Sequence, residues 1–425
     1  MEQYAKYKDS GIDWLGYIPY SWETRKIKYM FEIVKRPYYL EDRQVLSITQ
    51  RGLRIKNVEK IDGQMAESYS GYQEVNVNDF AMNSMDLLTG WVDCSSFEGV
   101  TSPDYRVFRF FPMQPQCHDY YKYIFQICYK NRIFYRLGQG VSNLGRWRLQ
   151  ADQFLNMKLP KPPIQEQETI AIYLESRTAD IDILLGELQM QAEMFESYKR
   201  EVIVETIIHG LFDGDSKRDS GVTWIGRIPA NWDIVALRAV AKENTVKNAG
   251  MKCENLLSLS YGIIIKKDIN TTFGLLPDNF ESYQIVQPGY VILRLTDLQN
   301  DKRSLRTGYV SEMGIITSAY TGLIPSGQVD NKFFAYLLHA YDLKKIYYSL
   351  GGGVRQSLKY SDLKSLPILV PPMQEQKAIV AYIDIKTAQI NDLITDINEQ
   401  IDKLKQYRQI VIHDAVTGKI RVTEG

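Results

Sequence analysis

The stretch DSGIDWLGYIPYSW, from Asp9 to Trp22, occurs a second time as DSGVTWIGRIPANW, from Asp219 to Trp232. Eight of the fourteen positions are identical, and the copies lie 210 residues apart in a chain of 425. A second phrase keeps nearly the same spacing, because PPIQEQETIAIYL from Pro162 returns as PPMQEQKAIVAYI from Pro371, with seven of thirteen positions identical. Solenoid repeats have periods of about 20 to 50 residues. The much longer period found here therefore predicts two homologous halves of domain size.

The composition is that of an ordinary globular protein, with 44% hydrophobic and 24% charged residues. No apolar run approaches the roughly 20 residues of a membrane-spanning helix, and the N-terminal MEQYAKYKDSG lacks the apolar core of a signal peptide. We therefore expect a cytoplasmic protein. The four cysteines form no C-x-x-C pair and no histidine stands at metal-ligand spacing from them, so we expect neither a metal site nor a disulfide framework.

The net charge of zero conceals an uneven distribution along the chain. Residues 23–160 contain 19 Lys and Arg against 15 Asp and Glu, and residues 233–370 contain 16 against 12. Residues 161–210 contain 4 against 10, and residues 371–425 contain 7 against 8. The two globular segments are therefore basic, which is typical of a nucleic-acid partner, and the connecting segments are acidic or nearly neutral.

Each globular segment contains a predicted hairpin and, later, a basic aromatic stretch that ends in a glycine turn. The hairpins are VLSITQRGLRIK from Val45 and LLSLSYGIIIKK from Leu256. The basic stretches are YKYIFQICYKNRIFYRLGQGVSNLGRWR from Tyr121 and LKKIYYSLGGGVRQSLKY from Leu343. Neither basic stretch contains an acidic residue. We therefore expect both kinds of loop to face a polyanion.

Arginine can donate two hydrogen bonds to guanine or to phosphate, and Asn or Gln can pair with adenine, so residues of these types are the candidates for DNA contact. The alternative for each is an ordinary solvated surface. The candidate DNA-binding residues are Arg51, Arg54, Lys56, Arg136, Gln139, Asn143, Arg146 and Arg148 in the first half, and Lys266, Lys267, Arg294, Arg303, Arg306, Arg355, Gln356 and Lys359 in the second.

A long helix is predicted after each Pro-Pro phrase, because apolar residues recur there at heptad spacing. One register contains Ile181, Leu188, Phe195 and Val202 in the first helix, and Ile390, Ile397, Leu404 and Val411 in the second. The other register contains Leu184, Gln191 and Tyr198, and then Leu393, Gln400 and Tyr407.

We expect these two seams to pack on each other as an antiparallel coiled coil with pseudo-twofold symmetry. The alternative is that each helix packs on its own domain. A helix from about Arg177 to Ile207 would be roughly 45 Å long, and one face of B-DNA repeats every 34 to 36 Å. Two reading domains on such a spacer can therefore reach successive segments of the major groove.

Sequence motifs of the common catalytic classes are absent. The chain has no G-x-x-x-x-G-K-[ST] phosphate loop, no G-x-S-x-G elbow, no H-E-x-x-H pair and no Asn/Asp-Pro-Pro-Tyr/Phe motif of amino-methyltransferases. We therefore predict a protein without catalytic residues of its own.

The two duplicated phrases, together with the helix ends YKREVIVETIIHG and YRQIVIHDAVTGKI, give the chain a specific resemblance. It resembles the specificity subunit of a type I restriction-modification system, and the resemblance covers essentially the whole chain. This resemblance implies an α+β fold with target-recognition domains at 1–160 and 216–370 and conserved helical regions at 161–215 and 371–425.

The resemblance also implies a function and a set of partners. Such a subunit is not an enzyme, and it directs two methyltransferase (modification) subunits and the restriction (translocase and nuclease) subunits to a bipartite, asymmetric target in double-stranded DNA. S-adenosylmethionine, ATP and Mg²⁺ would be bound by those partners, and no metal by this chain. The first glycine turn is four residues longer than the second when both are aligned on the following Pro-Pro pair, so contacts cannot be transferred across that loop.

Two other classes of protein stay open at this stage. One is a coiled-coil structural or interaction protein without DNA specificity, and the other is a nuclease or methyltransferase with an unrecognised site. No motif in the sequence encodes which bases are read.

Overall fold

The computed structural model describes residues 2–40, 42–57, 68–112, 116–139, 147–211, 216–269, 279–298, 301, 304–350 and 357–423. The chain divides into two compact units. The first unit consists of Met1–Glu187 and Gln400–Gly425, and the second of Leu188–Glu399. None of the described helices is long and apolar enough to cross a membrane.

In the described residues of the first unit, thirteen strands and four short helices are followed by the start of a long helix. In chain order they are β1 (Tyr7–Asp9), β2 (Tyr17–Pro19), β3 (Glu23–Lys26), η1 (Ile27–Tyr29), β4 (Phe31–Val34), β5 (Pro37–Tyr38), β6 (Leu46–Thr49), β7 (Gly52–Ile55), β8 (Tyr72–Val75), β9 (Phe80–Met82), β10 (Val92–Cys94), β11 (Gly99–Thr101), β12 (Arg106–Phe110), α1 (His118–Lys130), α2 (Ile133–Leu137), α3 (Ala151–Asn156), β13 (Lys158–Lys161) and α4 (Ile164–His209).

The second unit repeats this order almost element for element. Its elements are β14 (Lys217–Asp219), β15 (Arg227–Pro229), β16 (Asp233–Ala236), α5 (Leu237–Val240), β17 (Ala241–Glu243), β18 (Leu257–Ser260), β19 (Ile263–Lys266), β20 (Gln284–Val286), β21 (Val291–Leu293), β22 (Thr307–Tyr309), β23 (Gly314–Ile316), β24 (Thr321–Pro325), α6 (Asn331–Leu343), α7 (Ile346–Leu350), α8 (Tyr360–Leu363), β25 (Pro367–Val370) and α9 (Met373–Val416).

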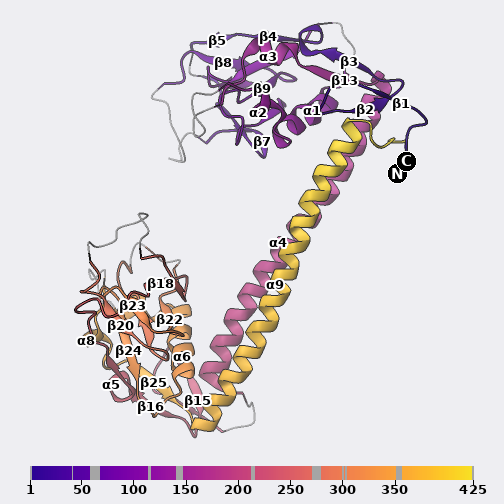
Figure 1. The fold of residues 1–425 in the computed structure, drawn as a ribbon. Coiled ribbons are helices and arrows are strands. Elements are labelled where there is room, and N and C mark those ends of the chain that lie inside the picture. The colour runs from indigo at the N-terminus through magenta and orange to yellow at the C-terminus, as the bar shows by residue number, and fades with distance from the viewer. Residues whose placement is uncertain are drawn as a thin grey trace. The chain divides into compact units, whose positions relative to one another are not determined.

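Equivalent strands pair in the same way in the two units. The largest sheet has the strand order β10-β9-β12-β4 in the first unit and β22-β21-β24-β17 in the second, with antiparallel pairing throughout. The two hairpins expected from the sequence are confirmed as β6–β7 and β18–β19. The prediction of a duplicated domain is therefore confirmed at the level of topology (Figure 1).

Each unit has a hydrophobic core between its main sheet and one helix. In the first unit, Phe31, Phe80 and Phe108 on three neighbouring strands contact Phe125 of α1, with ring centroids 5.1 to 5.5 Å apart. In the second unit, α6 takes the place of α1 and contributes Phe333 and Phe334, which are fully buried. This packing fixes the loops at the ends of the strands to a rigid base.

Helices α4 and α9 lie side by side and run antiparallel within each unit (Figure 1). In the first unit, Asp182 accepts two hydrogen bonds from Arg408, at 3.0 Å and 3.1 Å. In the second unit, Lys199 Nζ lies 3.0 Å from Asn391 Oδ1. The two contacts are 17 residues apart in each helix, and the residue number rises along α4 while it falls along α9. The predicted antiparallel pairing is therefore confirmed.

The helices begin earlier than the heptad pattern indicates, since α4 starts at Ile164 and not near Arg177. Their ends also pack on the globular parts. Ile170 and Leu174 at the start of α4 belong to the core of the first unit, and Ile203 and Ile207 at its end belong to that of the second. Both alternatives from the sequence are therefore found: the long helices pair with each other, and their ends also pack on the globular domains.

One of the two predicted heptad registers is wrong. Ile181, Val202, Ile390, Ile397 and Val411 of the first register are buried, and Leu188, Phe195 and Leu404 are partly buried.

In the second register, by contrast, Leu184, Tyr198 and Leu393 are 48%, 51% and 45% exposed, and Tyr407 is only partly buried. The helix pair instead covers the residues one position later, namely Leu185, Ala192, Lys199, Ile394, Ile401 and Arg408. Both positions are apolar at Leu184–Leu185 and at Leu393–Ile394, so the heptad count cannot distinguish the two registers by hydrophobicity.

Candidate nucleic-acid interface

The duplicated phrases form the joint between each globular part and its long helix. In the first unit, the indole Nε1 of Trp22 donates a hydrogen bond of 2.9 Å to Glu166 Oε2. In the second unit, Trp232 Nε1 donates to Glu375 Oε1 at the same distance. Both tryptophans are fully buried. The tryptophan of one phrase therefore contacts the glutamate of the other, which explains why the two phrases occur together.

A glutamine in the same phrase ties the long helix to the helix that covers the sheet. Gln167 Nε2 donates to Pro162 O at 2.9 Å, and Gln376 Nε2 donates to Pro371 O at 2.8 Å. The Oε1 atoms accept backbone N–H groups at the start of α1 and α6, from Cys117 at 3.2 Å and from Asp330 at 2.7 Å. The repeated residues are thus structural, and the reading surface must lie elsewhere in each unit.

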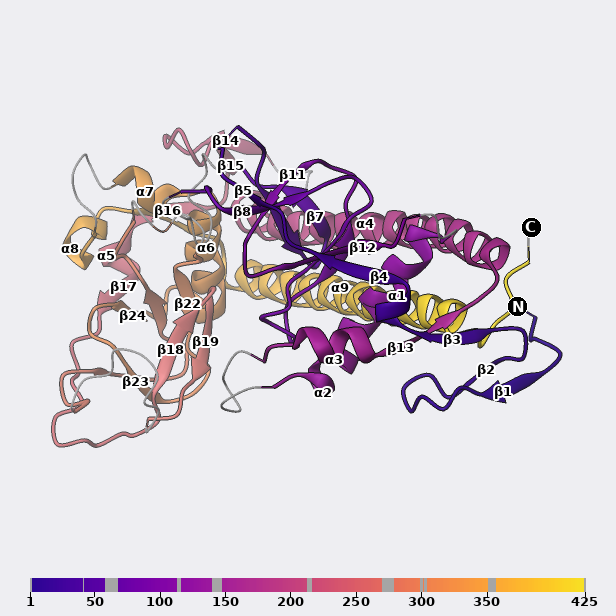
Figure 2. The same ribbon diagram turned by 90° about the horizontal axis from the view of Figure 1, so that it is seen from above.

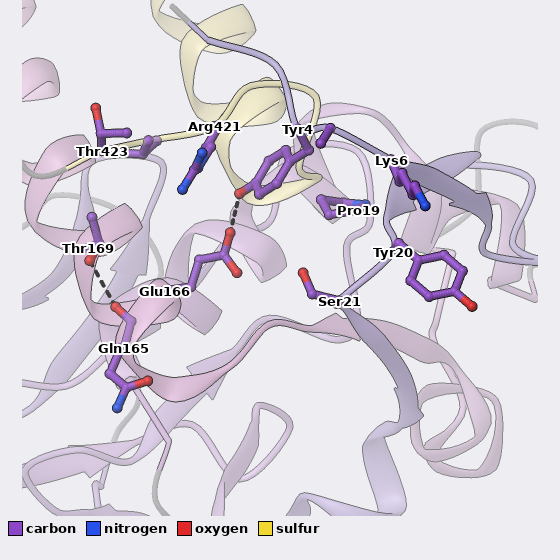
Figure 3. A pocket seen from close by; sticks show the side chains of 12 residues that line it. Tyr4, Lys6, Pro19, Tyr20, Ser21, Gln165, Glu166, Thr169, Arg421 and Thr423 are labelled. Atoms are coloured by element: carbon purple, nitrogen blue, oxygen red, sulfur yellow. Dashed lines mark hydrogen bonds between the residues drawn. The ribbon is translucent and has the colours of Figure 1, made fainter.

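A hollow of about 750 Å³ lies beside this joint in the first unit (Figure 3). Its lining includes Tyr4, Glu166 and Arg421, and Figure 3 shows the Tyr4 hydroxyl pointing at the Glu166 carboxylate, to which it donates a hydrogen bond. Burial, and then the bond to Glu166, raise the pKa of Tyr4 far above its ordinary value, so this hydroxyl remains a donor. The carboxylate is occupied by Tyr4 and Trp22, and we assign the hollow to the joint.

The first hairpin presents two of the predicted arginines to solvent. Arg51 in its turn and Arg54 on β7 are exposed, and Lys56 just beyond β7 is half-buried. The backbone N–H of Leu53 donates to Asp93 Oδ2 at 2.8 Å, which fixes the hairpin to β10. Burial raises the pKa of the Asp93 carboxyl above its ordinary value. Arg51 and Arg54 therefore project from an anchored strand pair.

One further loop, which the sequence analysis did not identify, forms hydrogen bonds both with this hairpin and with the segment that follows the glycine turn. Residues 83–91 join β9 to β10. Gln50 Nε2 in the hairpin turn donates to Thr89 O at 3.3 Å, and Leu149 N beyond the glycine turn donates to Ser84 O at 3.1 Å. The hairpin and the segment around Leu149 therefore flank one loop.

The side chain of Asp86 shapes that loop by accepting the backbone N–H groups of Leu88 and Thr89, both at 2.9 Å. A Cβ at Gly90 would meet Asp86 O at 2.0 Å, so only glycine fits there. The sequence Asp86-Leu-Leu-Thr-Gly90 predicts such a turn, because Asp and Gly are residues that turns favour.

The predicted residues after α2 lie at this same surface. Gln139 and Arg148 pair through two backbone hydrogen bonds of 3.0 Å, and both side chains are exposed, as is Arg136 on α2. Asn143 and Arg146 lie outside the described residues. Three exposed basic side chains, Arg51, Arg54 and Arg148, thus stand on segments that touch the β9–β10 loop.

In the second unit the equivalent loop runs from Arg294 to Arg306. Leu358 N donates to Leu295 O at 2.9 Å, and the turn of the β18–β19 hairpin rests on Leu305. Lys266 and Lys267 on the hairpin and Lys359 before α8 are exposed, whereas Arg294 is half-buried with its guanidinium 3.7 Å from Asp301. Arg303, Arg355 and Gln356 lie outside the described residues.

The prediction that Arg306 contacts DNA is wrong, because its side chain is completely buried. Its guanidinium donates to the carbonyl oxygens of Arg294 (3.2 Å), Thr296 (2.7 Å) and Asp297 (3.2 Å), and also to that of Asp301. Its Nε lies 3.0 Å from the Tyr348 hydroxyl. Arg306 therefore holds the described residues of the β21–β22 segment, from Arg294 to Asp297 and at Asp301, in place from inside.

Among the residues that the structure describes, no group of three or more His, Cys, Asp or Glu side chains could hold a metal ion. The geometry is that of two homologous domains, each with basic exposed loops at one surface, carried on a shared antiparallel pair of helices.

Comparisons with known proteins assign this arrangement to one class. Residues 308–403 match the family described as the type I restriction modification DNA specificity domain. The chain is 23% identical over 430 residues to the type I restriction enzyme MjaX specificity subunit of Methanocaldococcus jannaschii, with 96% of each protein covered. It is 26% identical to the MjaVIII specificity subunit of the same organism over 63% of each chain.

Two solved structures have the same fold. One, from a study of complex assembly and conformational transition of the type I R-M system, matches with a TM-score of 0.66 and 15% identity, covering 94% of this chain and 98% of that one. The HsdS subunit from Thermoanaerobacter tengcongensis matches with a TM-score of 0.50 and 14% identity, over 94% and 98% of the two chains. The chain is thus similar along almost its whole length to a type I restriction enzyme specificity subunit, and it shares its fold with an HsdS subunit.

Proposed function

We propose that this chain is the DNA-reading subunit of a type I restriction-modification complex and that its two units read the two halves of a bipartite target. The observation that carries this proposal is the duplication itself. Two domains of one topology stand on a shared helix pair, while their exposed loop residues differ: Arg54 in one hairpin corresponds to Ile265 in the other. A common frame with different surfaces is what an asymmetric two-part target requires.

The proposal extends to the partners. Two methyltransferase subunits and the restriction subunits assemble with this chain in the cytoplasm, and they bind S-adenosylmethionine, ATP and Mg²⁺. The exposed apolar side chains on the long helices support a docking role, since Ile183, Met190 and Met194 on α4 are 61% to 72% exposed. The chain contributes target choice, and its partners contribute the chemistry.

A reconstitution experiment tests this function. The chain is purified with and without a modification subunit from its own gene neighbourhood, and each sample is incubated with S-adenosylmethionine and genomic DNA. We expect N6-methyladenine at one bipartite motif only when both proteins are present. Methyl transfer by this chain alone, or the same methylation pattern without it, would show that it is not a specificity subunit.

A further inference from the structure

The hairpin of the second unit presents an apolar face to solvent. Ile264 of β19 packs with Leu257 and Leu259 in a buried cluster, whereas its neighbours Ile263 and Ile265 are 65% and 41% exposed. This alternation follows from the two-residue period of a strand, which sends successive side chains to opposite faces. Strands β18 and β19 lie side by side (Figure 2). Ser258 and Ser260 of β18 pair directly with Ile265 and Ile263 of β19, and directly paired residues of an antiparallel pair lie on the same face.

The turn of this hairpin carries a third exposed apolar side chain. Tyr261 is 75% exposed and has a φ of +46°, and it is followed by Gly262 with a φ of +83°. Asn, Asp or Gly ordinarily occupy such a pair of positions, because a left-handed backbone is unfavourable for other residues. The left-handed backbone of Tyr261 is costly and its side chain is largely exposed, and such a position is a candidate for a role in binding.

The surroundings of Tyr261 are basic. Two hollows of about 350 Å³ and about 640 Å³, both within the second unit, flank this tyrosine. Their linings together contain five basic side chains, Lys199, Arg200, Lys332, Lys344 and Lys345, and the two carboxylates of Glu201 and Glu205. Lys199 is also paired with Glu196 and Lys332 with Asp384, so the linings carry a small excess of positive charge. Lys266 and Lys267 at the end of the hairpin are also exposed. A hairpin with an apolar face and basic side chains beside it is suited to bind a polyanion that displays apolar groups within a groove.

The hairpin of the first unit has the same backbone and a different chemistry. Ser47 and Thr49 correspond to Ser258 and Ser260, but Arg54 occupies the place of Ile265 and Gly52 that of Ile263. Hydroxyl groups are thus retained on both outer faces, and the residue beside them changes from a charged donor to an apolar side chain. The two hairpins cannot recognise the same group.

We propose that the β18–β19 hairpin enters the major groove and reads thymine through its 5-methyl group, using Ile263 and Ile265 with Tyr261 at the tip. The major groove admits a two-stranded β-ribbon, and the thymine methyl is the apolar group that this groove displays. This inference rests on the proposed function and names the chemistry by which the second unit reads its half-site. In the first unit, Arg54 favours hydrogen-bonded contacts instead.

Deoxyuridine, which lacks only the 5-methyl group of thymidine, tests the proposal. The complex with its modification subunits is titrated with its target duplex and a scrambled duplex, and then with duplexes in which each thymine of both half-sites is replaced singly by deoxyuridine. We expect weaker binding, by about fourfold per buried methyl group, at one or more positions that all lie in one half-site.

Variants assign that effect to the hairpin. In Ile265→Ala and Ile263→Ala complexes the difference between thymine and deoxyuridine should disappear at the sensitive position, whereas the matched Arg54→Ala variant should retain it. Equal binding of all deoxyuridine duplexes by the unaltered complex would overturn the proposal. So would an unchanged discrimination in both isoleucine variants, or a half-site without any thymine.

Two further outcomes are separable. If the isoleucine variants remain folded by circular dichroism but no longer copurify with the modification subunit, the apolar face is a protein interface and the thymine proposal is wrong. If the unaltered complex fails to prefer its target to the scrambled duplex, it is the proposed function that has failed, and the thymine proposal falls with it.

Discussion

Arg306 and Arg54 belong to the same predicted set of DNA-binding residues, but their surroundings differ completely. Arg54 is exposed on a hairpin, whereas Arg306 is fully buried and donates to four carbonyl groups of one loop. Residue type and a basic neighbourhood could be read from the sequence, but burial could not, because it depends on where the β21–β22 loop folds. The sequence therefore predicted which kinds of side chain to examine and not which of them reach solvent.

Replacing Arg306 by Met should destabilise the second unit. The substitution leaves several buried carbonyl groups without a donor, and we expect a loss of about 3 kcal/mol or more in the free energy of unfolding. Arg54→Ala is the control, for which the change should stay within about 0.5 kcal/mol. Chemical denaturation with a probe in the second unit measures both. Equal stability of the two variants would contradict the structural role of Arg306.

His339 gives a prediction about pH. Burial, with a smaller contribution from the charge of Lys199, lowers the pKa of His339 to about 4. An unfolded histidine has a pKa of about 6.5. Between these values the unfolded state binds the proton and the folded state does not, so stability is present above pH 6.5 and is lost as the pH falls towards 4.

The unfolding temperature of the second unit should therefore fall more steeply between pH 6.5 and pH 4 in the unaltered protein than in His339→Gln. Thermal unfolding at half-unit pH steps provides the comparison. Parallel curves for the two proteins would show that His339 makes no contribution in this range.

At the scale of elements, the joint formed by the duplicated phrases has the same tryptophan–glutamate hydrogen bond in both units. Trp22→Phe and Trp232→Phe each remove one hydrogen bond to a carboxylate and leave the aromatic packing largely in place. We expect each to cost about 1.5 to 3 kcal/mol in its own unit.

Trp224→Phe, in the same phrase, is the matched control. Its ring contacts Tyr341 edge-on at 4.7 Å, so the substitution should cost less. Hydrogen-exchange rates resolved by segment would show which unit is weakened. A loss confined to the Trp224 variant would mean that the glutamate bonds do not hold the joint.

The long helices show how far a periodic pattern can be trusted. Their existence and antiparallel pairing were predictable from heptads, because a long apolar seam must be covered. The second register was not predictable from the sequence. Leu184 and Leu185 are both leucines, and only the position of the other helix decides which of them is buried. Leu184, Tyr198 and Leu393 are left exposed.

At the scale of the whole molecule, the account predicts that the helix pair sets the distance between the half-sites. Removing Glu187–Met190 from α4 and Gln400–Lys403, at the matching register, from α9 shortens the pair by about 6 Å, at 1.5 Å per residue. The half-sites should move closer by about two base pairs of 3.4 Å each. Sequencing of methylated adenines gives the spacer length directly. An unchanged spacer in a variant that still assembles would mean that the helices do not measure the distance.

The duplicated architecture was the part of the structure most accessible from the sequence, because two phrases at one spacing specify two copies of a domain. The pairing of the main sheets was not accessible, and neither was the contact of the β9–β10 and β21–β22 loops with the hairpins, since both depend on contacts between segments far apart in the chain. The sequence therefore located two reading domains and left the composition of each reading surface to the structure.

The central claim is that each unit reads its own half of the target, and exchange of one unit tests it most directly. Residues 23–160 are replaced by the equivalent segment of a relative with a known target, the chain is expressed with its modification subunits, and methylated adenines are mapped across the genome. The account predicts that one half-site changes to that of the relative while the other half-site persists. A change in both halves, or in neither, in a complex that still methylates DNA would contradict it.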